Sequence, residues 1–226
     1  MANLIAIVGN SGSGKSTSFR TLDPKETFII NVASKPLPFR GWKAHYTTFN
    51  KDNPTGNYLS TSDVATINKI LLHIDAKRPE IKNVIIDDAQ YIMSFEAMDR
   101  AKERGFDKFT EIAQKFYSIL KESISLRDDL SIIVSCHSEN VGSADEPKYK
   151  IKTVGKMIDN LITVEGLFTY VFFTDISTDD KNNTVYSFIT KSDGTTTAKT
   201  PLDCFETVKI PNDMQFVLNT INEYNS

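Results

Sequence analysis

The sequence predicts an α/β fold with a mainly parallel central sheet that continues into antiparallel hairpins toward the C-terminus. In the first part of the chain, short continuous apolar runs alternate with segments of helical periodicity, which is typical of parallel strands buried on both faces. In the last part, strand-like runs follow one another across tight-turn pairs, which is typical of antiparallel hairpins. With 226 residues and 40% hydrophobic composition, one domain over residues 1–226 is enough to bury such a core.

The net charge, hydropathy and cysteine content of the chain limit the kinds of partner that we expect. A net charge of −3 gives no global field that would draw the chain to nucleic acid or to an anionic membrane, although a local basic strip can still bind DNA. No apolar run approaches the roughly 18 residues that a membrane span needs. The 2 cysteines form neither a disulfide framework nor a zinc pattern. We therefore expect a cytoplasmic protein with no membrane partner.

The start of the chain predicts two buried strands joined by a short helix. Residues 4–8 form a continuous apolar run that ends at a glycine, and residues 27–32 form a second run of the same kind. A short helix should begin within residues 14–22 and stop before Asp23-Pro24, because the residue before a proline disfavours helical geometry.

Residues 43–78 predict a strand and an amphipathic helix. Residues 43–49 alternate between polar and apolar side chains, which predicts a strand with one exposed face. Residues 60–78 open with hydroxyl and acidic caps and continue with apolar side chains at helical spacing. Those apolar side chains are Val64, Ile67, Leu71 and Ile74.

Apolar runs, helical periodicity and tight-turn pairs predict the remaining strands and helices. Residues 83–90 and 130–137 predict two more buried strands, and the segment between them predicts a helix over residues 92–126 that is interrupted at Gly105. Further strands are predicted over residues 167–176, 184–190 and 195–200, with turns at Asn182-Asn183 and Asp193-Gly194, and a last helix over residues 213–224.

A glycine-rich segment follows the first predicted strand directly. Its sequence, GNSGSGKS from residue 9 to residue 16, fits the P-loop template of glycine, four residues, glycine, lysine and a hydroxyl residue. Glycines let the backbone curl so that successive N–H groups point at phosphate oxygens, and the following helix adds its positive N-terminal end. We therefore predict a nucleoside triphosphate site that uses Gly9, Asn10, Ser11, Gly12, Ser13, Gly14, Lys15, Ser16 and Thr17.

The P-loop template assigns roles to individual side chains, and it requires a carboxylate from another strand to help bind Mg²⁺. Lys15 should reach the β- and γ-phosphates, Ser16 should ligate Mg²⁺, and Thr17 should lie toward the α-phosphate. The run NVIIDDAQ supplies two carboxylates at the end of a predicted strand. Asp87 ends the apolar run and is predicted to hold Mg²⁺. Asp88 follows it and either orients or deprotonates the attacking water, or is a simple surface acid.

The arginine distribution bears on the class of reaction. No arginine follows Arg127, whereas small-molecule kinases usually close an arginine-bearing lid that comes from the later part of the chain. Late lysines, Lys191 and Lys199, flank the Asp193-Gly194 turn instead. ATP hydrolysis is therefore favoured, and a nucleotide kinase stays as a less favoured alternative.

The order of segments resembles a known family. The segments follow one another in a fixed order. They are the P-loop, the Asp-Asp strand, a helical segment ending FDKFTEIAQKFYSILKESI, the strand LSIIVSCHSEN, and the late runs GLFTYVFFT and YSFITKSDGTTTAKTPLDCF. From residue 3 to about residue 205, this order resembles the RecA-like AAA-type P-loop ATPases of bacteriophage genomes, a family associated with single-strand annealing and recombination. The resemblance implies a RecA-like core, ATP and Mg²⁺ as ligands, ATP hydrolysis, and action in phage DNA recombination or replication in the host cytoplasm.

The resemblance also implies roles for residues and partners. In RecA-like cores, the strand beside the P-loop strand ends in a polar residue that senses the γ-phosphate. His137 matches that residue, and a histidine that only caps a strand end is the alternative. Lys199 would contact the nucleotide of a neighbouring subunit in a homo-oligomer, unless it is a solvated strand residue.

Residues 139–156 contain four lysines around Tyr149 and match the DNA-binding loop of the family. A solvated loop is the alternative to contact with single-stranded DNA. Phage recombination proteins are the implied protein partners.

The chain differs from RecA-type recombinases at one position that matters for ATP hydrolysis. RecA-type recombinases place a catalytic glutamate just after the second strand, where this chain has Ala33 and Ser34. Without that carboxylate, hydrolysis must depend on Asp88 or be slow. A nucleotide-dependent switch or assembly factor with little hydrolysis is therefore the alternative function.

Overall fold

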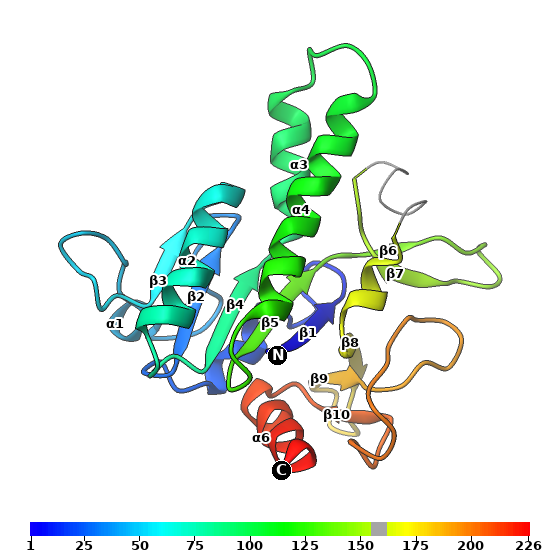
Figure 1. The fold of residues 1–226 in the computed structure, drawn as a ribbon. Helices are drawn as coiled ribbons and strands as arrows, with labels where there is room; N and C mark the ends of the chain where they lie inside the picture. The colour runs from blue at the N-terminus through cyan, green and yellow to red at the C-terminus, as the bar shows by residue number, and fades with distance from the viewer. Residues whose placement is uncertain (155–161) are drawn as a thin grey trace.

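The molecule is built around an eight-stranded sheet, counted among the residues that the structure describes (Figure 1). The structure is a computed structural model and describes residues 1–154 and 162–226. In chain order the strands are β1 (Asn3–Val8), β2 (Thr27–Asn31), β3 (Tyr58–Ser60), β4 (Asn83–Asp87), β5 (Ser131–Cys136), β8 (Tyr170–Thr178), β9 (Thr184–Ile189) and β10 (Lys209–Pro211).

The spatial order of these strands is β10-β9-β8-β1-β5-β4-β2-β3. From β8 to β3 all neighbours pair in parallel, whereas β9 and β10 extend the sheet with antiparallel pairs. The predicted α/β fold, with a mainly parallel sheet and C-terminal antiparallel strands, is confirmed. The residues of the predicted strands at 4–8, 27–32, 83–90 and 130–137 form β1, β2, β4 and β5.

Side chains on both faces of β1 are buried, which explains its continuous apolar run. Leu4, Ala6 and Val8 belong to one core cluster, and Ile5 and Ile7 belong to the other. Successive side chains of a strand point to opposite faces, so a strand covered on both sides reads as a mostly apolar run.

Helices cover the two faces of the sheet unequally. The first core cluster contains the apolar faces of α2 (Val64–Lys77) and α4 (Asp107–Ser125). The second contains buried side chains of the 3₁₀ helix η1 (Ser16–Thr21) and of α6 (Met214–Asn225). α3 (Gln90–Asp99) and α4 form a helical hairpin that projects beyond the sheet (Figure 1). The break between α3 and α4 contains Gly105 at φ 89°, which confirms the predicted interruption.

Three further short elements lie outside the main sheet and the helices that cover it. β6 (Ser138–Asn140) and β7 (Tyr149–Ile151) pair as a separate antiparallel hairpin directly after β5. The 3₁₀ helix η2 (Val164–Leu167) precedes β8, so this strand begins later than the predicted residue 167.

The predicted strand over residues 43–49 is wrong. Trp42–His45 form the one-turn helix α1, and Thr48 makes only an isolated bridge to Tyr58. The side chain of Asn57 holds this segment in place, because its Oδ1 accepts from the Thr47 N–H (2.8 Å) and its Nδ2 donates to the carbonyl of His45 (3.1 Å). These bonds connect residues ten or more positions apart, and the alternation of polar and apolar side chains carries no information about them.

One other expectation needs correction. Residues 195–200 form no strand: Thr196 and Lys199 make isolated bridges to Tyr149 and Val171. The short helix predicted within residues 14–22 is confirmed as the 3₁₀ helix η1, which begins at Ser16 and ends at Thr21.

Within residues 1–154 and 162–226, no helix combines the length and the apolar character that crossing a membrane requires.

Candidate functional site

The candidate site is a cavity where the parallel strands end. β1, β2, β4 and β5 run in the same direction, so the residues that follow them gather at one edge of the sheet. Ligands of open α/β sheets bind in crevices at this edge. The cavity is lined by residues 11–17 of the glycine-rich segment together with Lys35, Asp87, Asp88, His137 and others.

The glycine-rich loop (residues 9–16) needs glycine at two positions for steric reasons. A Cβ at Gly9 would lie 1.8 Å from Oγ1 of Thr174 on β8, a distance that no side chain tolerates. Gly14 has φ 94°, and a Cβ there would also press on Tyr186 at 3.1 Å. The loop is therefore curled and tightly packed, as the template predicts.

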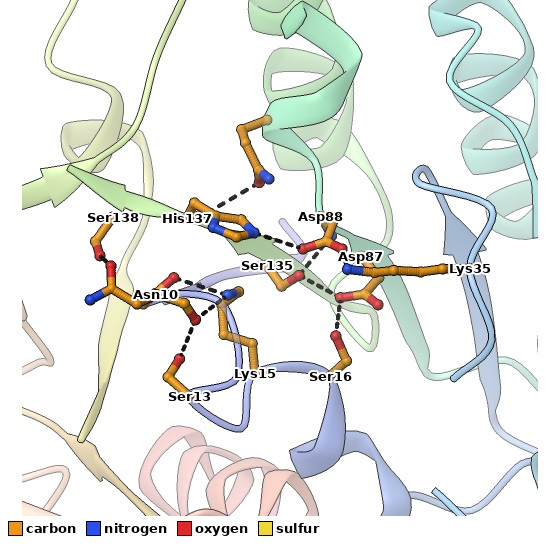
Figure 2. Close-up of polar contacts among 12 residues, drawn as sticks. Asn10, Ser13, Lys15, Ser16, Lys35, Asp87, Asp88, Ser135, His137 and Ser138 are labelled. Carbon is orange, nitrogen blue, oxygen red and sulfur yellow. Dashed lines mark hydrogen bonds and ion pairs between the residues drawn. The ribbon is translucent and has the colours of Figure 1, made fainter. Parts of the chain in front are cut away.

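Lys15 lies inside the curl of this loop. Its Nζ donates to the carbonyl oxygens of Gly9 and Asn10, both at 2.9 Å, and the residue is 5% exposed (Figure 2). Burial lowers the pKa of Lys15, and the charges of Asp88 and Asp87 oppose that shift. The loop therefore holds a preorganised cation at the cavity wall.

Asp87 connects the loop to the tip of β4. Its Oδ1 accepts from the hydroxyl of Ser16 at 2.9 Å and from the hydroxyl of Ser135 at 2.6 Å. Burial and the charge of Asp88 raise the pKa of Asp87, while the two hydroxyl donors lower it. A hydroxyl and a carboxylate that already touch are oxygen ligands suited to Mg²⁺, so the residues fit the metal that the template implies.

Asp88 has a different environment from its neighbour. It has φ 57°, a strained left-handed conformation that its N–H, donating to Ser135 Oγ at 2.8 Å, helps to hold. Its carboxylate forms an ion pair with Lys35, and Nε2 of His137 lies 3.5 Å from its Oδ1. Burial raises the pKa of Asp88, but hydrogen bonds from His137 and Lys35 outweigh it and bring the pKa to about 2. The group is an ionised carboxylate and a weak base.

His137 follows β5, the strand that pairs with β1. Its backbone N–H donates to Oε1 of Gln90 at 3.2 Å, and its ring packs edge-on against Tyr91. Its ring lines the cavity, where its Nε2–H can donate to Asp88 or to a ligand.

Sequence reasoning missed two residues of this site, Lys35 and Ser135. Ser135 had a signal, because it follows the apolar residues 132–134 and stands two positions before the histidine. Lys35 stands in the segment after β2, where RecA-type recombinases have a glutamate, and it supplies a cation instead.

Two predicted functional regions lie away from the cavity lining. Lys199 is exposed, and its backbone pairs with Val171 of β8 through bonds of 2.8 and 3.0 Å. In the candidate DNA-binding loop, Lys148 and Lys152 are exposed, and Tyr149 packs against the core. Lys150 contacts Glu139 at 3.3 Å, and residues 155 and 156 lie outside the described residues.

The chain was compared with models of protein families and with curated proteins. Neither comparison finds a match.

Proposed function

We propose that this chain is a Mg²⁺-dependent ATPase with a RecA-like P-loop core, which acts on single-stranded DNA in phage recombination or replication. The observation that carries the proposal is the 2.9 Å hydrogen bond between Ser16 Oγ and Asp87 Oδ1. It joins the hydroxyl beside the loop lysine to a carboxylate 71 residues away. A chance glycine loop has no reason to meet a buried carboxylate at the tip of another strand.

The residues of the site suggest how the reaction would proceed. Backbone N–H groups of residues 9–16 and the ammonium of Lys15 bind the phosphates. Ser16 and Asp87 would hold Mg²⁺, which would supply charge neutralisation at the phosphates when it is bound. Because its pKa is about 2, Asp88 orients the attacking water and does not remove its proton in the ground state. His137 donates to the γ-phosphate.

Two features support the finer parts of the proposal. His137 follows the strand that neighbours β1, as expected for the γ-phosphate sensor of a RecA-like core. The β6–β7 hairpin begins immediately after His137 and presents Lys148 and Lys152 to solvent, which suits contact with the backbone of a single strand.

Phosphate release from ATP tests the proposal. We expect turnover that needs Mg²⁺ and rises when single-stranded DNA is added. Ser16→Ala and Asp87→Asn should each lower turnover by roughly 100-fold, because each removes an oxygen ligand of the metal. Ser177→Ala, an exposed hydroxyl on β8, is the control. No ATP binding, or turnover only with a metabolite acceptor, would refute the proposal.

A switch or assembly factor with little hydrolysis is the second candidate. The low pKa of Asp88 and its ion pair with Lys35 favour it, because neither suits a strong catalytic base. Asp88→Asn separates the two: an ATPase should lose most of its turnover and keep ATP binding. A switch would show an unchanged, low turnover.

A further inference from the structure

We propose that Lys35 is a second phosphate-binding residue, which leaves Asp88 and binds the terminal phosphate when a nucleoside triphosphate enters the cavity. The inference rests on the proposed function, because it takes residues 9–17 to hold that triphosphate. It assigns a role to the cavity wall that faces the glycine-rich loop.

Lys35 belongs to the same cavity as the loop but comes from a different element. It follows β2 and lines the cavity together with residues 11–17. Figure 2 shows the carboxylate of Asp88 between the side chains of Lys35 and His137, with Lys15 and Ser16 on the loop below them. A ligand that extends from the loop toward Asp88 therefore meets Lys35.

The backbone around Lys35 is anchored, whereas its side chain is half exposed and is held at the ammonium by Asp88. The amide of Asn31, which is fully buried at the end of β2, donates to the carbonyl of Lys35 and to the hydroxyl of Tyr58 (2.9 Å). Ser34 has φ 56°, and its hydroxyl accepts from that of Ser60. The side chain of Lys35, in contrast, is 52% exposed. The residue is thus held at the cavity while its ammonium is free to change partner.

The charges of the cavity favour such an exchange. Asp87 and Asp88 are 1% and 2% exposed, so Lys35 compensates a buried carboxylate in the absence of a ligand. A terminal phosphate offers the same ammonium a partner with more negative charge, and charge-assisted bonds of this kind are strong. Lys15 donates to two loop carbonyls and keeps a third N–H for the phosphates, so Lys35 is the cation that must leave a carboxylate to bind them.

The exchange would couple the presence of a terminal phosphate to the state of Asp88. With a triphosphate bound, Asp88 loses one cationic partner and gains room for a water molecule. With a diphosphate bound, Lys35 remains on Asp88. The site would then distinguish the two nucleotides by charge.

Binding measurements without hydrolysis test the proposal. The affinities of a non-hydrolysable ATP analogue and of ADP, each with Mg²⁺, are measured by calorimetry for the full chain and for Lys35→Met. We expect analogue binding to weaken roughly 10- to 100-fold, as for loss of one charge-assisted bond, and ADP binding to change far less. Lys35→Arg should retain most of the preference, and the exposed Lys51→Met, which makes the same charge change elsewhere, should have no effect.

A double-mutant cycle with Asp88→Asn examines the exchange itself. Removing the carboxylate frees Lys35, so the effect of Asp88→Asn on analogue binding should differ between the wild-type and the Lys35→Met backgrounds. Equal effects in both backgrounds, or equal weakening of analogue and ADP by Lys35→Met, would overturn the proposal. A wild-type chain that binds neither nucleotide would instead refute the proposed function.

Discussion

Asp87 and Asp88 are adjacent in the chain and chemically identical, yet the fold shifts their pKa values in opposite directions. Asp87 is buried beneath two hydroxyl donors, and burial raises its pKa. Asp88 turns to Lys35 and His137, and these donors bring its pKa to about 2 despite burial. The left-handed conformation of Asp88 separates the two side chains. The pair therefore combines a buried carboxylate bonded by two hydroxyls and an ionised carboxylate in one short stretch.

The two carboxylates should contribute to stability with opposite signs. The pKa of Asp88 lies below its ordinary value of 3.8, so its charge stabilises the fold at neutral pH. Asp88→Asn should lower the free energy of unfolding by about 1–2 kcal/mol, less than the full shift implies because the ion pair with half-exposed Lys35 is screened. Asp87→Asn should raise the free energy of unfolding, since it removes a charge that burial disfavours.

Urea unfolding at pH 7, without nucleotide or metal, measures both changes. The difference between wild type and Asp88→Asn should disappear as the pH falls from about 4 to about 2, because the carboxylate takes up its proton in that range. Destabilisation by both substitutions alike would contradict the assignment of opposite environments.

Gly14 gives a second prediction at this scale. Gly14→Ala places a Cβ at φ 94° and 3.1 Å from Tyr186, so we expect a loss of about 1–2 kcal/mol of stability and weaker nucleotide binding. Gly194→Ala is the matched control, because its φ is 96° and a Cβ there meets nothing within 4 Å. Thermal unfolding should show both losses of stability, and titration with a fluorescent ATP analogue should show weaker binding for Gly14→Ala alone. Unchanged binding by Gly14→Ala would mean that the loop does not hold phosphate.

At the scale of elements, the site depends on which strands are neighbours. β5 lies between β1 and β4, so Ser135 reaches Asp87 and His137 reaches Asp88. β2 lies on the other side of β4, and in its register Asn31 is paired with Asp87. The loop after β2 therefore brings Lys35 to the same cavity. Polar groups lie at or just after the carboxyl ends of β2, β4 and β5, and the order of the strands decides which groups meet.

The β6–β7 hairpin makes a prediction about DNA binding. Each lysine that contacts a backbone phosphate of single-stranded DNA contributes about −0.7 to the slope of log affinity against log salt. Replacing Lys148 and Lys152 with alanine should weaken binding and reduce the magnitude of that slope by about 1.4. Fluorescence anisotropy with a labelled oligonucleotide over a range of salt concentrations measures it.

The control for this experiment is the pair Lys51→Ala and Lys181→Ala, two exposed lysines outside the hairpin. The double control should leave the slope unchanged. An equal reduction in both double variants would show that binding responds to overall charge and not to the hairpin.

At the scale of the whole molecule, Lys199 raises the question of assembly. It is exposed beside β8, and it lies outside the cavity lining among the residues that the structure describes. A role at a nucleotide site therefore requires a second copy of the chain. The nucleotide cavity and the exposed lysine would then belong to two surfaces that meet in a homo-oligomer.

Mixing two inactive variants tests this arrangement. Lys15→Ala removes the loop cation, and Lys199→Ala removes the cation offered to a neighbour. In a mixed oligomer, some interfaces combine an intact Lys15 with an intact Lys199, so the ATPase activity of the mixture should exceed the sum of the separate activities. A mixture with no gain over that sum would contradict a role for Lys199 in trans.

The fold class, the four central strands, the glycine-rich loop and the carboxylates at the tip of β4 could all be predicted from the amino-acid sequence. These features follow from local signals: apolar periodicity, glycine spacing and a charged residue at the end of an apolar run. The tertiary structure decided the partners of each polar group, including Lys35 on Asp88 and Ser135 on Asp87. It also decided that residues 42–45 form a helical turn held by Asn57. Such contacts join residues distant in the chain, and they exist only once the order of the strands brings the ends of those strands together.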